Sequence, residues 1–268
     1  MSCPKESATI NRYETGSPEC ARREVSSIRK QIMTIAFDDV TLQEAVDFAM
    51  DHVRTRQRCR VVTPNAEFAM EAKKNPRFLK ILNGSQLVLA DGISVIYASK
   101  ILGTPLRGRV TGVGFAQALC QALAEQGGSL YLLGAKPGVA EQAADRLKTA
   151  YPGLRIAGTH DGYFKEEAPV VEAINAARPD AMLVCLGAPK QEYFMEDHGA
   201  QLEVPVMAGL GGSMDVLAGN VCRAPEFFQK AGLEWLYRLG KEPKRIRRMA
   251  KLPLYLWDAI VWKWKGAQ

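Results

Sequence analysis

Long apolar runs and paired cysteines are both missing from this 268-residue sequence. No stretch of 18 uncharged apolar residues occurs, so no segment is expected to span a membrane alone. The N-terminus has no apolar core segment, which argues against a signal peptide. The six cysteines are scattered without a C-x-x-C spacing, which predicts reduced core residues rather than disulfides or zinc ligands. These absences favour a protein of a reducing compartment.

The common nucleotide- and metal-binding motifs are also missing. The lack of G-x-x-x-x-G-K-[ST] argues against a P-loop kinase or ATPase, and no G-x-S-x-G elbow is present. The three histidines share no metal-ligand spacing. No Asp-x-Asp pair is available to hold a nucleotide diphosphate through Mg²⁺ or Mn²⁺. Gly112-Val113-Gly114 matches only part of the dinucleotide fingerprint, because residue 117 is Gln and the preceding residues are not strand-like. We therefore expect neither a metal nor a cofactor.

Basic residues are concentrated near the C-terminus of a chain whose net charge is +6. Between Arg238 and Lys251, seven Lys or Arg residues accompany a single acid, Glu242. Such a segment favours a polyanionic partner, which includes phosphates, nucleic acid or an anionic membrane surface.

Apolar runs alternate with amphipathic segments through the middle of the chain. Thr41 and Glu44 form a capping box that opens the first helix, over 42–56. Alternation of this kind, joined by short glycine-bearing turns, predicts an α/β fold with a mostly parallel, Rossmann-like sheet and flanking helices. Strands are expected at 59–62, 86–90, 129–134, 154–159, 181–186 and 204–209, and further helices at 66–73, 93–102, 112–126, 137–151, 166–177 and 189–199.

The pattern divides the chain into three parts. Residues 1–30 are polar and aperiodic and are expected to form a disordered arm. Residues 31–222 are expected to form the α/β catalytic domain. In that domain, the glycine-rich residues 209–212 are expected to be flexible and to lead into a compact loop. Residues 223–268 are expected to form a helical, basic, tryptophan-rich appendage.

The appendage has the pattern of an amphipathic helix. Trp257, Trp262 and Trp264 lie close to a basic flank, which is typical of a helix lying in a membrane interface. The alternative is a helix packed on its own core or on a second copy of the chain, and Pro253 argues against one long helix. The apolar positions at helical spacing are Ile246, Met249, Pro253, Leu256, Ile260 and Trp264.

Asp91 ends the apolar run that begins at Leu87 and is followed by Gly92. A carboxylate at the carboxyl end of a parallel strand is well placed to act as an acid or base. The alternative is that Asp91 caps the helix beginning near Ile93, and on local sequence alone the cap is favoured because caps are commoner.

Other polar residues and glycines follow the expected strands and helices in the same way. Each has a structural alternative: Thr63 and Asn65 as turn or cap residues, Asp161 as part of a simple turn, and Lys190 as a solvated helix start. Because the carboxyl ends of parallel strands share one edge of the sheet, we expect these residues to gather there. The set is Thr63, Asn65, Arg109, Thr111, Gly134, Lys136, Asp161, Tyr163, Gly187, Lys190 and Gln191.

A series of short motifs resembles one known family. From about Ile32 to about Lys251, the chain resembles the WecG/TagA/CpsF family of bacterial glycosyltransferases. The motifs that carry the resemblance occur in order: Val62-Thr63-Pro64-Asn65, Ala90-Asp91-Gly92, Arg109-Val110-Thr111-Gly112, Leu132-Leu133-Gly134, Asp161-Gly162-Tyr163-Phe164, Gly187-Ala188-Pro189-Lys190-Gln191-Glu192 and Arg223-Ala224-Pro225.

The resemblance implies metal-independent, inverting transfer of a sugar from a UDP-sugar to a polyprenyl-diphosphate-linked acceptor. It implies that this occurs at the inner face of the cell membrane, on the cytoplasmic side. Asp91 would then be the base, and Thr63, Asn65, Arg109 and Gln191 would line the pocket. Arginines of the appendage would close over the nucleotide, with Arg238, Arg245 and Arg248 as the best matches.

Physical chemistry supports this interpretation independently. A single displacement needs one base for the acceptor hydroxyl, and the leaving diphosphate needs cations to balance its charge. Without an Asp-x-Asp metal site, arginine is the natural substitute. The donor sugar stays open among N-acetylmannosamine, its uronic acid and glucose.

Two other functions, in an oxidoreductase or in a nucleic-acid-binding protein, would need features that can be checked in the sequence. An NAD-dependent oxidoreductase needs a complete glycine fingerprint and a ribose-binding acid, and the sequence has neither. A nucleic-acid-binding protein would use the basic tail with stacking tryptophans. We expect no nucleic-acid partner, because the basic run belongs to one appendage and not to a groove across the fold.

Overall fold

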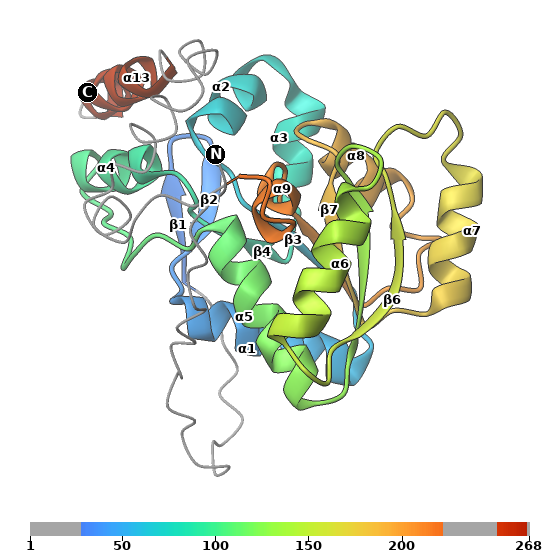
Figure 1. Ribbon diagram of the computed structural model, residues 1–268. Coiled ribbons are helices and arrows are strands. Elements are labelled where there is room, and N and C mark those ends of the chain that lie inside the picture. Colours follow the sequence, from blue (N-terminus) through green and yellow to red (C-terminus); the bar gives the residue numbers. More distant parts are fainter. Residues whose placement is uncertain (1–27, 222–250, 267–268) are drawn as a thin grey trace.

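A six-stranded parallel sheet forms the centre of the computed structural model, which describes residues 28–221 and 251–266 (Figure 1). The strand order is β4-β3-β8-β7-β5-β6, and every neighbouring pair is parallel. The predicted Rossmann-like α/β fold is confirmed, and each expected strand is present with its ends displaced by at most two residues. The strands are β3 (Cys59–Val62), β4 (Leu87–Val88), β5 (Ser129–Gly134), β6 (Arg155–His160), β7 (Ala181–Cys185) and β8 (Val206–Gly209).

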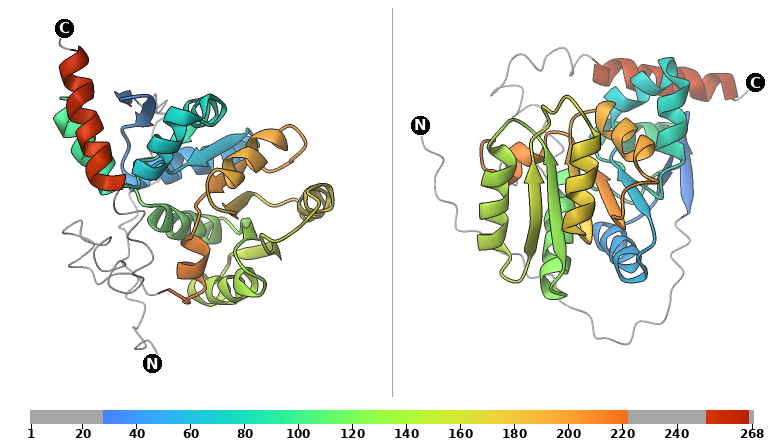
Figure 2. Two further views of the ribbon diagram at one scale, coloured as in Figure 1. Left: turned by 90° about the horizontal axis from the view of Figure 1, so that it is seen from above. Right: turned by 90° about the vertical axis from the view of Figure 1, so that its right-hand side faces the viewer.

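Helices cover both faces of this sheet, as the two views in Figure 2 show. Along β5, Leu130 and Leu132 join the core on one face, whereas Tyr131 and Leu133 join the core on the other. A strand that is buried on both sides needs apolar residues at every position, which is why the strands are continuous apolar runs in the sequence. The first face is covered by α1 (Leu42–Thr55), α5 (Gly112–Glu125), α6 (Val139–Ala150) and α9 (Ser213–Leu217). The second is covered by α2 (Ala66–Lys74), α3 (Pro76–Asn83), α4 (Ile93–Ile101), α7 (Ala168–Ala177) and α8 (Lys190–Asp197).

The helix caps follow the local sequence closely. Thr41 accepts a hydrogen bond from the backbone N–H of Glu44 at 3.2 Å, and the Glu44 carboxylate accepts one from the Thr41 N–H at 2.8 Å. The predicted capping box of α1 is therefore confirmed. Pro137 was expected in the first turn of its helix, but α6 begins at Val139 with Gly138 as its N-cap.

Three elements were not expected from the sequence. Asn75 ends α2 and also caps α3, where its side chain accepts from the Phe78 N–H at 3.1 Å and Pro76 takes the first helical position. The compact loop expected after the glycine-rich residues 209–212 contains the short helix α9. The third element is an antiparallel hairpin of β1 (Arg29–Ile32) and β2 (Ile35–Asp38), so that Arg29 and Lys30, at the end of the expected arm, lie in a strand.

The hairpin protects the outer edge of β4. The buried Asp38 carboxylate accepts from the Val88 N–H at 2.7 Å and pairs with the Arg29 guanidinium at 3.2 Å. These contacts satisfy an edge N–H of a very short strand that would otherwise be buried without a backbone partner.

The helix α13 (Lys251–Gly266) packs beside α4 and α2 at one end of the molecule (Figures 1 and 2). Tyr255 and Ala259 on its inner face are fully buried in the core of the second sheet face. Lys251 pairs with Glu67 of α2 at 2.9 Å, and Lys73 of α2 pairs with Asp258. For this face, the alternative that the helix packs on the chain's own core is therefore confirmed. Pro253 does not interrupt the helix, because α13 runs from Lys251 to Gly266.

The opposite face of α13 is open to solvent. Trp257 and Trp264 on this face are 64% and 74% exposed, and Leu254 is also exposed. Trp262 lies on the same side of the helix as Tyr255 and Ala259 and is 46% exposed. None of the described helices is both long and apolar enough to cross a membrane. Three exposed tryptophans on one helix of this length indicate a surface that contacts a partner.

Tyr255 provides a test of how α13 docks. Tyr255→Ala should lower the free energy of unfolding by about 3–5 kcal/mol and make α13 sensitive to trypsin, because a buried ring is lost. The matched variant Tyr255→Phe should change it by less than about 1 kcal/mol, since the buried hydroxyl has no partner among the described residues. Urea denaturation and limited proteolysis measure both effects, and wild-type behaviour of the alanine variant would contradict this docking.

Candidate active site

The expected site residues gather along the carboxyl edge of the sheet in two groups. The first follows β4, β3 and β8, and the second follows β5, β6 and β7. The pairing of Val62 with both Val88 and Gly209 places the ends of the first three strands side by side, although they are far apart in sequence.

Asp91 is not the N-cap residue of the following helix. The N-cap of α4 is Gly92, the next residue along the chain. The interpretation favoured from local sequence was therefore wrong, because the chain stays extended for one residue longer than a cap at position 91 requires. Asp91 is half-buried.

The neighbours of Asp91 come from two other loops. A Cβ added to Gly92 would lie 3.0 Å from the Asn65 Cβ, so this glycine allows the chain to pass close to Asn65. The backbone N–H of Val110 donates to the carbonyl of Ala90 at 3.1 Å, which brings Arg109 and Thr111 to the same place. The structure thus gathers Asp91, Asn65, Arg109 and Thr111, as the sequence predicted.

Asn65 and Thr111 both serve as helix caps. The Asn65 oxygen accepts from the N–H groups of Glu67 and Phe68 at 2.9 and 3.3 Å, and the Thr111 hydroxyl accepts from Gly114 at 3.1 Å. The structural alternative is thus confirmed for Asn65. The Asn65 cap uses only the side-chain oxygen, so the amide nitrogen keeps its two donors.

Thr63 connects β3 to the loop after β8. Its hydroxyl donates to the carbonyl of Gly209 at 3.2 Å. A Cβ added to Gly112 would lie 3.7 Å from this hydroxyl and 3.4 Å from Ser213 of α9, so the starts of α5 and α9 meet here. Gly112 serves this close approach, and a Cβ at Gly114 would meet only the capping Thr111 hydroxyl. Because α5 follows α4 with no strand between them, these are not the glycines of a dinucleotide-binding turn.

Gln191 is fully buried and ties α8 to the same loop. Its side-chain oxygen accepts from the Gly211 N–H at 2.9 Å, and its amide nitrogen donates to the carboxyl of Glu192 at 2.7 Å. Glu192 is itself fully buried. Burial raises the pKa of the Glu192 carboxyl to about 7, and the hydrogen bond from Gln191 opposes that rise only in part.

The second group surrounds the turn after β5. Gly134 has a φ of +122°, and a Cβ there would lie 2.4 Å from the Cys185 backbone, so only glycine fits. The Ala135 carbonyl accepts from the Gly162 N–H at 2.9 Å, which joins this turn to the turn after β6. Asp161 forms the simple turn that was its alternative, accepting from the Tyr163 N–H at 2.7 Å.

Lys190 opens α8 on the rim of this second group. Its ammonium donates to the Gly162 carbonyl at 3.3 Å and lies 4.5 Å from the centre of the Phe164 ring. Lys136 and Tyr163 are exposed, and Gly187 adopts a φ of +79° in the turn before α8. Since β5 and β7 are neighbours whose connections leave in opposite directions, this is the topological switch point of the sheet, where ligands collect.

The appendage arginines Arg238, Arg245 and Arg248 lie outside the described residues. Among the residues that are described, no cluster of three His, Cys, Asp or Glu side chains could hold a metal ion.

Comparison with known proteins decides the family. The model of the glycosyl transferase WecG/TagA/CpsF family matches residues 30–268. A protein of Bacillus spizizenii is 40% identical over 73% of this chain and 76% of its own length. Relatives from Bacillus subtilis and Staphylococcus aureus are 33% and 31% identical, over 84% and 87% of this chain and 88% and 92% of their own lengths. All three are named N-acetylglucosaminyldiphosphoundecaprenol N-acetyl-beta-D-mannosaminyltransferase.

The chain belongs to the WecG/TagA/CpsF family of glycosyl transferases.

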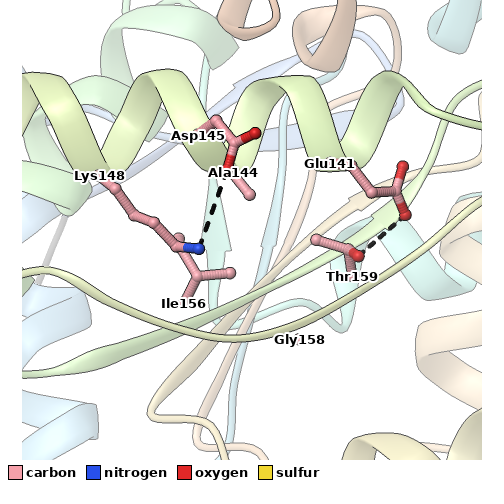
Figure 3. A pocket seen from close by; sticks show the side chains of 7 residues that line it. All are labelled: Glu141, Ala144, Asp145, Lys148, Ile156, Gly158 and Thr159. Carbon is pink, nitrogen blue, oxygen red and sulfur yellow. Dashed lines mark hydrogen bonds and ion pairs between the residues drawn. The ribbon is translucent and has the colours of Figure 1, made fainter.

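Two hollows of this glycosyltransferase lie away from the carboxyl edge. One, of about 230 Å³, lies between α6 and β6 (Figure 3). Its Glu141 accepts a hydrogen bond from Thr159 at 2.9 Å, and Asp145 lies 4.0 Å from Lys148. The other, of about 350 Å³, is lined by Arg56 and Arg58 near the amino ends of β3 and β8. Neither contains a residue expected at the site.

Sequence reasoning missed three contributors to the site. Ser213 and Gly211 follow β8 in a segment noted only for its glycines, and Glu192 entered only as the last letter of a motif. A buried carboxyl gives no signal in a sequence, because Glu at a helix start is usually solvated.

The raised pKa of Glu192 predicts how stability depends on pH. The folded protein holds the proton of the Glu192 carboxyl more tightly than the unfolded chain does. The stability that this protonation contributes is therefore complete below about pH 4.5 and is lost as the pH rises through about 7. Glu192→Gln does not titrate, so its stability relative to wild type should rise by about 3 kcal/mol between pH 4.5 and 8. Urea denaturation across this range measures the difference, and parallel pH curves would contradict the assignment.

Proposed function

We propose that this family member transfers N-acetylmannosamine from its UDP-linked form to polyprenyl-diphosphate-linked N-acetylglucosamine, without a metal and with inversion. The donor sugar is chosen from the three left open by the sequence because all three relatives carry that name. The observation that carries the proposal is the placement of Asp91 at the carboxyl edge of the sheet, where it is gathered with Asn65, Arg109 and Thr111.

In the proposed reaction the hydroxyl oxygen of the acceptor sugar attacks the anomeric carbon of the donor. The bond from that carbon to the diphosphate breaks, and its electron pair leaves with UDP. Asp91 takes the proton of the attacking hydroxyl. A single displacement of this kind inverts the anomeric centre and needs only one base.

The leaving diphosphate requires positive charge. Arg109 is half-buried beside Asp91, and Lys136 and Lys190 stand at the switch point of the same sheet edge. Arg238, Arg245 and Arg248 complete this set in the proposal. Arginine suits the role because its planar group can donate two parallel hydrogen bonds to phosphate oxygens.

Asp91→Asn tests the base. Transfer should fall by at least about 100-fold because the amide cannot accept the proton. UDP should still raise the melting temperature of the variant as it does that of wild type, whereas NAD should raise neither. The matched control is Asp145→Asn, an exposed carboxylate on α6 that should leave transfer unchanged.

A product assay with UDP-N-acetylmannosamine and a short-chain polyprenyl-diphosphate acceptor gives the rates. Asp91→Asn with near-normal transfer would remove the base assignment. Protection of the wild type by NAD in place of UDP would instead favour an oxidoreductase.

The proposed location is the inner face of the cell membrane, on the cytoplasmic side, where the lipid-linked acceptor is found. The exposed tryptophan face of α13 supports contact with an anionic surface, because indole rings favour the interfacial region and Lys251, Lys263 and Lys265 lie on the same helix. A second copy of the chain is the other candidate for that face.

The double substitution Trp257→Ala/Trp264→Ala separates these partners. Binding to phosphatidylglycerol-containing vesicles should weaken by about tenfold or more, since each lost ring contributes on the order of 1–2 kcal/mol. The matched control is Ile28→Ala, which also removes an exposed apolar side chain, 72% exposed, but from a different segment. The backbone of that segment is bonded to Asp39, just before α1, and not to α13. Unchanged vesicle binding together with loss of a dimer in sedimentation would assign the face to a second copy.

A further inference from the structure

The proposed reaction gives no role to the buried carboxyl of Glu192. Glu192 lies in the first turn of α8 with no exposed surface, beside the end of β8. Burying a carboxyl costs stability unless hydrogen bonds or a paired charge replace its contacts with water.

The contacts of Glu192 are few and specific. One carboxyl oxygen accepts the Gln191 amide at 2.7 Å, and the other has no partner among the described residues. A Cβ on Gly209 would lie 3.2 Å from the accepting oxygen and 3.0 Å from the Gln191 nitrogen, so the glycine leaves room for this pair.

This hydrogen bond decides which way the Gln191 amide faces. A primary amide has one donating end and one accepting end, and an oxygen of Glu192 can receive only the donating end. The accepting end must then face the Gly211 N–H, at 2.9 Å. Without an acceptor at position 192, the buried Gln191 donors have no partner and the amide loses its reason to face this way.

Gly211 belongs to the loop that joins β8 to α9. The same loop holds Gly209, whose carbonyl accepts the Thr63 hydroxyl at 3.2 Å, and leads to Ser213 beside Gly112. The orientation of Gln191 therefore fixes a loop that contacts two expected site segments.

We propose that Glu192 is a positioning residue of this site, which acts through the Gln191 amide to hold the Gly209–Ser213 loop against Thr63. The link to sugar transfer rests on the proposed function, whereas the link to the loop does not. What the position requires is an acceptor oxygen, which a carboxylate, a protonated carboxyl and an amide all supply.

Two substitutions of similar size separate this role from packing. Glu192→Gln keeps an acceptor oxygen and should retain at least about one third of the wild-type kcat. Glu192→Met removes it, and kcat should fall by about tenfold or more, because the loop that contacts Thr63 is then no longer held in one arrangement. The control is Phe194→Leu, a buried change on the same helix at a residue that contacts the Phe164 and His198 rings and keeps the Glu192 acceptor.

Hydrogen exchange at the Gly211 amide measures how firmly the loop is held, and the experiment needs no substrate. The amide should be protected in the wild type, Glu192→Gln and Phe194→Leu, and should exchange at least about tenfold faster in Glu192→Met. Backbone NMR on labelled full-length protein resolves this single amide.

Two results would overturn the inference. In the first, Glu192→Met keeps the Gly211 amide protected from exchange and has the wild-type kcat. In the second, Glu192→Gln lowers kcat and the protection of Gly211 as much as Glu192→Met does. A wild type that transfers nothing from the UDP-sugar would refute the proposed function alone, and the Gly211 exchange pattern would still decide the role of Glu192.

Discussion

The parallel pairing of β3 with β8 is the constraint on which the candidate site depends. These strands are far apart in the chain, yet Val62 pairs with Gly209, and the next residue, Thr63, donates its hydroxyl to the Gly209 carbonyl. With β4 on the other side of β3, the same register brings Asp91 near Asn65. A slip of one residue would turn every side chain of the strand to the opposite face, so the register is set by the two buried cores.

Buried polar contacts then refine what the sheet brings together. Hydrogen bonds inside a protein are strong when complete and costly when incomplete, so a chain such as Glu192, Gln191 and Gly211 favours one arrangement. The loop after β8 is held by two contacts: the Gly211 N–H donates to Gln191, and the Gly209 carbonyl accepts from Thr63. Of its glycines, Gly209 is needed for close approach to Gln191 and Glu192, whereas a Cβ at Gly211 or Gly212 would meet nothing within 4 Å.

The helix α13 has two faces with different partners. Tyr255 and Ala259 dock it on the core, and the exposed Trp257 and Trp264 lie on the opposite side. An element that is anchored on one face and apolar on the other can hold a protein at a surface without crossing a bilayer. Its position next to α2 and α4, the helices that follow Asn65 and Asp91, places that surface close to the candidate site.

The sequence by itself determined the α/β class, the six strands, the capping box at Thr41 and the polar residues that end the strands. Those signals are local, since apolar runs, turns and caps depend on neighbours a few residues away. Only the tertiary structure decided that Gly92 and not Asp91 is the N-cap of α4, that the hairpin of β1 and β2 closes the sheet edge, and that the Gln191 amide donates to Glu192. Each of these depends on segments that meet only after folding, and no pattern within one segment records which partner it will meet.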